Sequence, residues 1–211
     1  MRPLFIFGTG GHACDVADVA DALGWRPVFV ARDQAEAEAW SRPDEVVLED
    51  EAVRVAGGSF ALGIGDNAAR ARVAGRFGQS LDFPSLIHPD TSFGRGQRAQ
   101  IESQPGNVVF AGVRFTSQIA VGAFCSFNLN ATVSHDVEIG DFVSVSPGAS
   151  VAGNVRIGEG ALLGVGVCVN QGTPARKLVI GQRCVIGSGA VVIGDCEPNS
   201  VYVGVPARKI R

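Results

Sequence analysis

The sequence predicts two consecutive domains: an α/β domain with a small, Rossmann-like parallel sheet over residues 1–85, and a β-solenoid over residues 86–211. Three observations lead to this prediction. Before residue 85, short apolar runs alternate with segments of helical spacing. After it, an apolar residue recurs at every sixth position. The chain also contains 28 glycines without a Gly-X-Y period, which indicates many tight turns and excludes collagen.

The first domain reads as strands and helices in the order β-α-β-α-β. Strands are expected at residues 3–7, 27–31 and 60–64, and helices at residues 12–23, 35–40 and 67–77. In the first helix Val16 and Val19 share one face, Asp15 and Asp18 lie on the other, and Gly24 ends the helix. This order implies a parallel sheet flanked by helices.

The second domain has a period of six residues. The recurring apolar positions are Val109, Phe115, Val121, Phe127, Val133, Ile139, Val145, Val151, Ile157, Leu163 and Val169. Three such hexads would close one triangular coil of about eighteen residues, with these side chains inward and small side chains at the corners. The pattern resumes at Ile180, so residues 171–179 are expected to form an exposed inserted loop. Such a loop is either a tolerated decoration or part of a site.

Charge and composition exclude several classes of protein. The net charge is −3 and no basic cluster occurs, which argues against nucleic-acid binding. The longest apolar run near the start, Leu4 to Phe7, is too short for a signal peptide or a membrane span, so we expect a soluble, cytoplasmic protein. Five cysteines without a CxxC motif are interpreted as reduced, buried thiols. The three histidines lack metal-ligand spacing, so no metal is expected.

His135 is the candidate catalytic residue. It lies between the inward Val133 and the corner residue Val137, so its side chain should point outward. One coil further on, Gly153 leaves open space beside the imidazole. A neutral imidazole is suited to act as a general base near neutral pH, and the adjacent Asp136 could fix its tautomer. The alternatives are an exposed turn histidine and a bystander carboxylate.

Polar and glycine residues follow the strands of the first domain. The turn Gly8-Thr9-Gly10-Gly11-His12 joins a strand to a helix, a context that favours anion binding, although it is not the complete dinucleotide fingerprint. The ends of parallel strands meet at one edge, so a ligand site is predicted there. Its candidate residues are Gly10, Gly11, His12, Arg32, Asp33, Gly65, Asp66, Asn67 and Arg70. The alternatives are a capping histidine, solvated loop charges and a helix cap at Asp66 or Asn67.

These segments, the hexads and the ending Val203-Gly204-Val205-Pro206-Ala207-Arg208 together resemble the hexapeptide-repeat acyltransferases. More narrowly, the whole chain resembles bacterial sugar acyltransferases of the sialic-acid O-acetyltransferase and bacillosamine-pathway N-acetyltransferase type. The resemblance implies a left-handed parallel β-helix and a homotrimer with active sites between subunits. It also implies that acetyl-CoA lies between adjacent β-helices and that the amino-terminal domain holds a nucleotide-linked sugar.

The resemblance also implies roles for individual residues. His135 matches the general base of the family, which is often followed by an acidic residue, and His12 matches a contact to the acceptor sugar. Positions that match contacts to CoA are Asn128, Ser144, Gly153, Val165 and Ser188. Some relatives carry a second histidine where Ser144 stands. Arg32 stands where an acidic residue is common, which leaves the nucleotide and the sugar open.

The expected function is direct acetyl transfer from acetyl-CoA to the amine of a nucleotide-linked 4-amino-4,6-dideoxy sugar, with His135 as the base. A sugar O-acetyltransferase is the close alternative. A second alternative is a non-catalytic hexapeptide-repeat scaffold that binds a nucleotide sugar. An NAD-binding Rossmann protein is disfavoured, because the first domain is short and Arg32 replaces the acidic residue that would hold a ribose.

Overall fold

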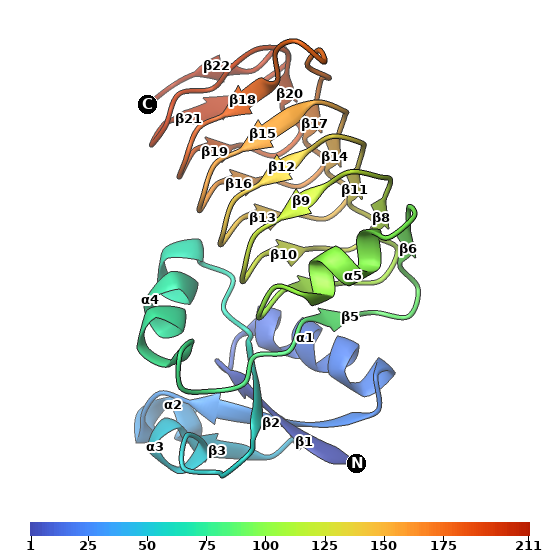
Figure 1. Cartoon of the computed structure of the whole chain (residues 1–211). Helices are drawn as coiled ribbons and strands as arrows, with labels where there is room; N and C mark the ends of the chain where they lie inside the picture. The colour runs from blue at the N-terminus through green and yellow to red at the C-terminus, as the bar shows by residue number, and fades with distance from the viewer.

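The structure is a computed structural model that describes all 211 residues. An α/β domain and a three-sided, left-handed β-helix are stacked end to end, and the chain terminates at the far end of the β-helix (Figure 1). The first strand of the β-helix begins at Leu86, which pairs with Val108 in the next coil.

The sheet of the amino-terminal domain has four parallel strands in the order β3-β2-β1-β4. The strands are β1 (Arg2–Phe7), β2 (Trp25–Ala31), β3 (Val46–Leu48) and β4 (Ser59–Leu62). The helices are α1 (Gly11–Ala22), α2 (Gln34–Glu38), α3 (Glu49–Ala52) and α4 (Asn67–Phe77). The three predicted strands and the three predicted helices are confirmed, with small shifts at their ends. The sequence prediction lacks β3 and α3, because β3 has only 3 residues and none of them is fully buried.

The two faces of this sheet carry different side chains, because residues alternate along β1. Leu4 and Ile6 belong to an apolar cluster with Val16 of α1. Phe5 and Phe7 belong to the cluster on the opposite face, where aromatic rings stack. At 12 residues α1 is the longest helix, and no helix combines the length and the apolar character needed to cross a bilayer.

The β-helix has three faces. The first face contains β5 (Leu86–Ile87), β7 (Val108–Val109), β10 (Ser126–Phe127), β13 (Ser144–Val145), β16 (Leu162–Leu163), β19 (Val185–Ile186), β21 (Val201–Val203) and β22 (Arg208–Lys209). The second face contains β6 (Ser92–Phe93), β8 (Arg114–Phe115), β11 (Thr132–Val133), β14 (Ser150–Val151), β17 (Cys168–Val169) and β20 (Val191–Val192). The third face contains β9 (Ala120–Val121), β12 (Glu138–Ile139), β15 (Val155–Ile157) and β18 (Leu178–Ile180), and α5 (Gln97–Glu102) contacts β9 at its lower end.

The hexad pattern sets the core. Ser126 pairs with Ser144, and Ser144 pairs with Leu162, so a regular coil contains eighteen residues. All the predicted recurring apolar residues are buried in one cluster that runs through the prism, which confirms the predicted period. The interpretation of all five cysteines as buried is wrong in part, because Cys168 is exposed and Cys14 is half-buried. Cys168 occupies an outward position of β17, whereas three other cysteines point inward.

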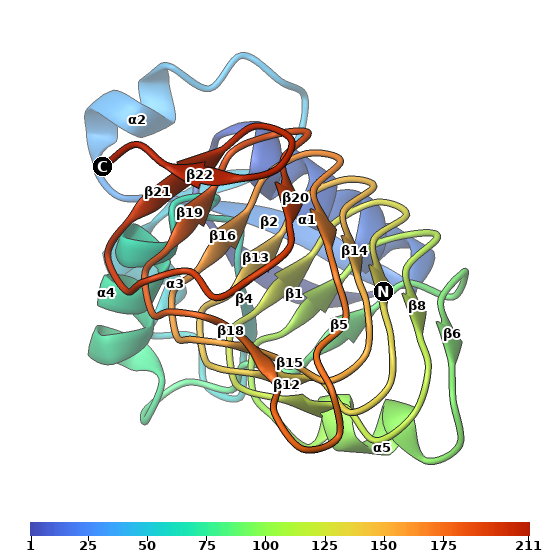
Figure 2. The same cartoon turned by 90° about the horizontal axis from the view of Figure 1, so that it is seen from above.

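The inserted loop leaves the prism after the second face. A turn over Thr173–Arg176 is closed by hydrogen bonds between the two backbones, at 2.8 and 3.1 Å. The chain rejoins the third face at Leu178, which pairs with Val155. Figure 2 shows this loop, in orange, extending beyond the outline of the coils.

Arg70 of α4 joins the two domains. Its side chain is 2% exposed. Its guanidinium donates to the carbonyl oxygens of Phe124 and Phe142 and to the Ser144 hydroxyl, at 2.9 to 3.0 Å. Asn67 accepts from both Arg70 and Ser144, at 2.9 and 2.6 Å, and donates to carbonyl oxygens of the corner before β16. We call Asn67, Arg70 and Ser144 the docking network.

The docking network contains three residues that the sequence analysis places in sites. Asn67 and Arg70 are predicted for the ligand site and Ser144 for the CoA site, and each has polar atoms engaged between the domains. The alternative interpretation as solvated loop charges is wrong for Arg70, which is buried. A buried guanidinium needs its donors satisfied, and the exposed corner carbonyls of a β-helix provide acceptors.

Replacing Arg70 with methionine should destabilise the protein by about 3 kcal/mol, because the buried carbonyl groups lose their donors. Urea unfolding monitored by circular dichroism measures this. The matched control is Arg72→Met on the same helix, whose side chain is exposed and has no ion pair in the chain. That variant should stay within about 0.5 kcal/mol of wild type. Equal stability of the two variants would contradict a docking role for Arg70.

Candidate active site

His135 stands on the corner between β11 and β12, as its position in the hexad predicts. Its Nδ1 lies 2.7 Å from Oδ2 of Asp136, and the two side chains are 55% and 40% exposed. Asp136 has a φ of 59°, in the left-handed region, and this backbone turn places its carboxylate beside the ring. With Asp136 ionised, Nδ1 is the donor of this hydrogen bond and Nε2 is the free basic nitrogen. The arrangement is that of a base oriented by a carboxylate.

Gly153 supports the imidazole from the next coil. A Cβ on Gly153 would lie 2.6 Å from Cε1 and 2.8 Å from Nε2 of His135, closer than any real contact. The open space that the sequence predicts beside the ring is therefore occupied by the ring itself. Any side chain at this position would force the imidazole to move. We call His135, Asp136 and Gly153 the catalytic corner, after the role predicted for His135.

The second group of candidate residues lies where β1 and β4 end. Gly10 is extended and precedes α1, so the first amides of this 12-residue helix, including those of Gly11 and His12, have no acceptor within the helix. Gly63 allows α1 to approach closely, because a Cβ there would lie 2.6 Å from Cα of Ala13. The close approach presents the amino-terminal end of α1 at the edge of the sheet, where an anion is favoured.

His12 is half-buried at this edge and incompletely bonded. Its Nε2 is inaccessible to solvent and has no hydrogen-bond partner in the chain. Its ring packs against Phe110, with centroids 5.6 Å apart, and Gly65 lies beside its Cβ. Burial lowers the pKa of His12 to about 4, and the charge of Arg70 adds to this effect. The imidazole is therefore neutral at neutral pH.

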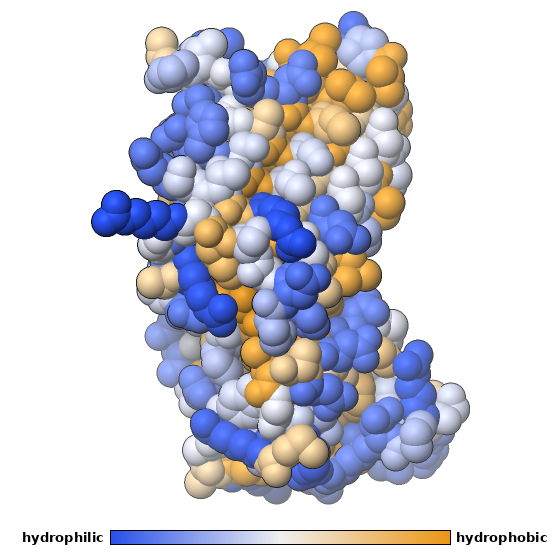
Figure 3. Space-filling view, turned by 90° about the vertical axis from the view of Figure 1, so that its right-hand side faces the viewer, coloured by the Kyte–Doolittle hydropathy of each residue, from blue (hydrophilic) through white to orange (hydrophobic).

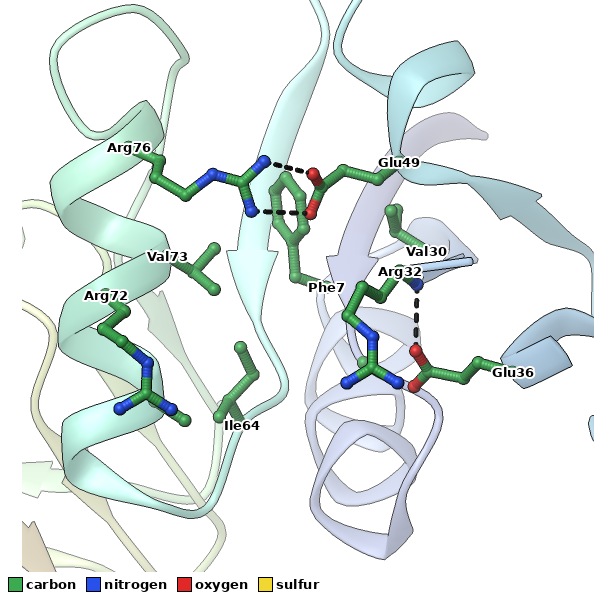
Figure 4. Close-up of a pocket in the computed structure, with 11 residues that line it drawn as sticks. Phe7, Val30, Arg32, Glu36, Glu49, Ile64, Arg72, Val73 and Arg76 are labelled. Carbon is green, nitrogen blue, oxygen red and sulfur yellow. Dashed lines mark hydrogen bonds and ion pairs between the residues drawn. The ribbon is translucent and has the colours of Figure 1, made fainter. Parts of the chain in front are cut away.

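A cavity of about 490 Å³ opens at the same edge (Figure 4). Arg32 and Arg72 extend along its two sides, and Val30, Val73 and other apolar side chains form its floor. Asp33 is not in the lining: its carboxylate accepts from the Glu36 amide at 2.9 Å and caps α2. The pKa of Asp33 is lowered by that backbone hydrogen bond and by the hydrogen bond from Arg32.

Sequence reasoning missed four charged residues of this cavity. Glu36 accepts from the Arg32 amide at 2.9 Å and from the Thr9 hydroxyl at 2.6 Å. Arg76 pairs with Glu49 through both of its terminal nitrogens, at 2.5 and 3.4 Å. Glu36, Glu49, Arg72 and Arg76 all line the cavity. Glu49 belongs to the unpredicted α3, whereas the spacing of Arg72 and Arg76 on the predicted helix could have indicated a shared face.

Asp66 caps α4 by accepting from the Ala69 amide at 2.7 Å, in agreement with the helix-cap alternative. Its neighbour Gly65 remains at the ligand edge beside His12.

The predicted CoA positions fall on three different parts of the β-helix. Asn128, Val165 and Ser188 lie on one edge, where the first face turns into the second, after β10, β16 and β19. Val165 is 54% exposed there. Gly153 belongs to the catalytic corner, on the edge between the second and third faces, and Ser144 belongs to the docking network. No group of three metal-ligating side chains is present.

Known proteins share this architecture. The PglD N-terminal domain family matches residues 3–77. The acetyltransferase domain of PglB from Neisseria gonorrhoeae, solved with acetyl coenzyme A, is 28% identical with a TM-score of 0.85, and 99% of each chain is covered. PerB from Caulobacter crescentus, solved with CoA and GDP-perosamine, is 28% identical with a TM-score of 0.85, covering 100% of this chain and 98% of PerB. WeeI from Acinetobacter baumannii shares the fold at 23% identity and a TM-score of 0.87, with full coverage of both chains.

The chain is similar over its whole length to hexapeptide-repeat sugar N-acetyltransferases. Its fold matches these proteins over the whole chain, not over the repeats alone. In this chain His135, Asp136 and Gly153 lie on the β-helix, and the predicted ligand edge lies on the α/β domain.

The stability of the protein should fall as the pH drops from 7 to 5, in part through His12. The unfolded histidine takes up a proton near its ordinary pKa, whereas the folded one resists protonation until about pH 4. The unfolded state therefore binds more protons in this window, and His12 should account for about 2 kcal/mol of the loss. Urea unfolding at both pH values should show a smaller loss in His12→Gln. Equal losses in the two proteins would refute the buried, neutral state of His12.

Proposed function

We propose that the protein transfers the acetyl group of acetyl-CoA to the amine of a nucleotide-linked 4-amino-4,6-dideoxy sugar. The observation that carries this proposal is the catalytic corner: an exposed imidazole held at 2.7 Å by a carboxylate and seated on a glycine. The likeness to the PglB domain and to PerB, which were solved with acetyl-CoA or with CoA and an amino-sugar nucleotide, supports the choice of donor and acceptor.

In the proposed mechanism, the acceptor amine attacks the thioester carbonyl carbon. Nε2 of His135 takes the proton that the amine loses, and Asp136 stabilises the imidazolium through Nδ1. The carbon–sulfur bond breaks, and the CoA thiolate leaves with the electron pair and takes up a proton. No covalent enzyme intermediate is required. Cys125 is an unsuitable nucleophile, because burial raises the pKa of its thiol to about 12.

We assign the nucleotide sugar to the α/β domain. The cavity beside Arg32 and Arg72 has the volume and the apolar floor that a nucleoside requires. The diphosphate would bind at the adjacent amino-terminal end of α1, at the amides of Gly11 and His12. The position of His12 in the first turn of α1 supports a contact to the sugar. The arginines and glutamates of the cavity are compatible with several bases, so the proposal leaves the nucleotide open.

Activity measurements on catalytic-corner variants test this function. Wild type should release CoA with one member of a panel of nucleotide-linked 4-amino-6-deoxy sugars, and His135→Ala should lower kcat at least about a hundredfold, the typical contribution of a general base. Asp136→Asn should have a smaller effect, because it preserves the contact but not the charge. Turnover only with sugar hydroxyl acceptors would replace N-transfer by O-transfer. Full activity of His135→Ala would favour the non-catalytic scaffold.

Two glycines provide a matched control for this experiment. Gly194 occupies the same corner as Gly153 on a higher level, and a Cβ there would meet nothing within 4 Å. Gly153→Ala should therefore reduce turnover strongly by displacing the imidazole, whereas Gly194→Ala should retain it. Equal activity of the two variants would contradict the steric role of Gly153.

We further propose a homotrimer with each active site between two subunits. His12 packs on Phe110, which lies on the edge that follows the first face, whereas His135 lies on the edge that follows the second face. Because these are different edges of one chain, a site that uses both residues would combine them from two subunits. The exposed Leu129 and Val165, and the many white and orange residues on the side that carries the second face (Figure 3), support burial against another copy.

The free cysteines suit a reducing compartment and support a cytoplasmic location, which cell fractionation tests.

Sedimentation equilibrium should give three times the 21.9 kDa mass of one chain. Val165→Asp introduces a charge on the edge between the first and second faces, where we expect the subunits to meet. It should weaken the assembly, because a buried charge without a partner is strongly unfavourable. A monomeric, fully active wild type would exclude sites shared between subunits.

A further inference from the structure

We propose that Lys177, in the inserted loop, is a positioning residue that holds the catalytic corner in its active geometry. The proposal rests on the assignment of His135 as the base and gives residues 171–179 a role in that site. Lys177 touches the backbone of the corner and not the reacting atoms.

The catalytic corner has one backbone acceptor that the coils leave free. The amide of Asp136 donates to Ser117 in the coil below, at 3.2 Å, and the carbonyl of His135 accepts from the Asn154 amide in the coil above, at 3.0 Å. The carbonyl oxygen of Asp136 receives no backbone donor. It accepts a hydrogen bond from Nζ of Lys177.

A second polar contact, to the carboxylate of Glu138, also fixes the ammonium group of Lys177. Its Nζ lies 3.4 Å from Oε1 of Glu138, and the second oxygen of Glu138 accepts from Arg156 at 2.7 Å. The hydrogen bond from Arg156 and then the charge of Lys177 lower the pKa of Glu138, so this carboxylate is ionised at neutral pH. The Lys177 side chain is 25% exposed, whereas that of Arg176 beside it is 78% exposed. Lys177 is therefore turned towards the protein.

The loop itself is built to hold this position. The Thr173 hydroxyl accepts from the Arg176 amide at 3.0 Å, and Leu178 donates to the carbonyl of Asn154 at 3.0 Å. Gly172 allows the loop to lie directly on the coil, because a Cβ there would be 2.2 Å from the carbonyl oxygen of Asn154. Both sides of Lys177 are thus anchored, on the same coil that supports His135.

The consequence concerns the orientation of the imidazole. Asp136 adopts a left-handed backbone and is 40% exposed, so its carboxylate is oriented mainly by the turn that Lys177 ties down. Without the ammonium, Asp136 gains freedom, and the hydrogen bond to Nδ1 of His135 loses its fixed geometry. Poor positioning of a general base lowers kcat and leaves ground-state binding of acetyl-CoA intact.

Lys177→Met and Arg156→Met form a matched pair for the test. Each removes one cation from Glu138, but only Lys177 bonds to the catalytic corner. We expect Lys177→Met to lower kcat about tenfold with a KM for acetyl-CoA close to that of wild type. Lys177→Arg should restore most of the rate, since it keeps a donor and a charge, and Arg156→Met should match wild type.

Nitrogen NMR of protein labelled with 15N-histidine gives a readout that does not require turnover. The chain has only three histidines, so each imidazole can be assigned by substitution. Lys177→Met should shift the His135 signals and leave those of His12 and His88 in place.

Unchanged His135 signals and an unchanged kcat would overturn the inference. So would a raised KM for acetyl-CoA at constant kcat, because Lys177 would then bind the donor. If wild type acetylates no acceptor, the proposed function fails, and the imidazole spectra alone decide whether Lys177 positions the corner.

Discussion

The stacking of residues eighteen apart is the constraint on which the rest of the β-helix depends. Parallel pairing such as Ser126 with Ser144 places each side chain directly over its counterpart in the next coil. Each position of the hexad therefore has the same environment, inward or outward, in every coil. The same register brings Gly153 of the next coil against the ring of His135, and it requires the inserted loop to return at Leu178 in phase with Val155. An insertion that did not return in phase would turn the inward column outward in every later coil.

The docking network connects this regular scaffold to the α/β domain. Arg70 is buried without a carboxylate in contact, and its charge is instead solvated by carbonyl groups and hydroxyl or amide oxygens from both domains. Burial lowers the pKa of Arg70, the charge of Asp66 opposes this effect, and the guanidinium stays protonated. Its charge in turn helps keep the imidazole of His12 neutral. The contact that orients the two domains thereby also tunes a group at the ligand edge.

Features that depend on residues close together in the sequence could be predicted, whereas features that join distant residues could not. The period of six and the outward position of His135 are local properties of the chain, and both were predictable. The docking network joins Arg70 to Ser144, 74 positions away, and nothing in either neighbourhood indicates the other. The carboxylates of the ligand cavity were missed for a related reason. Glu49 begins a short helix after a half-exposed strand of 3 residues, a segment too short for a periodic pattern.

The inserted loop shows what a regular coil cannot provide. Each coil presents side chains either into the prism or straight outward, and its backbone donors are committed to the coils above and below. A group that approaches the carbonyl of Asp136 from the side must therefore come from outside the repeat. The loop meets this need with few residues: a closed turn at Thr173, a glycine that lets it lie on the coil, and one lysine directed back at the corner. Under the role proposed for Lys177, a break in the hexad pattern two coils after an outward histidine is a sequence signal for a functional corner.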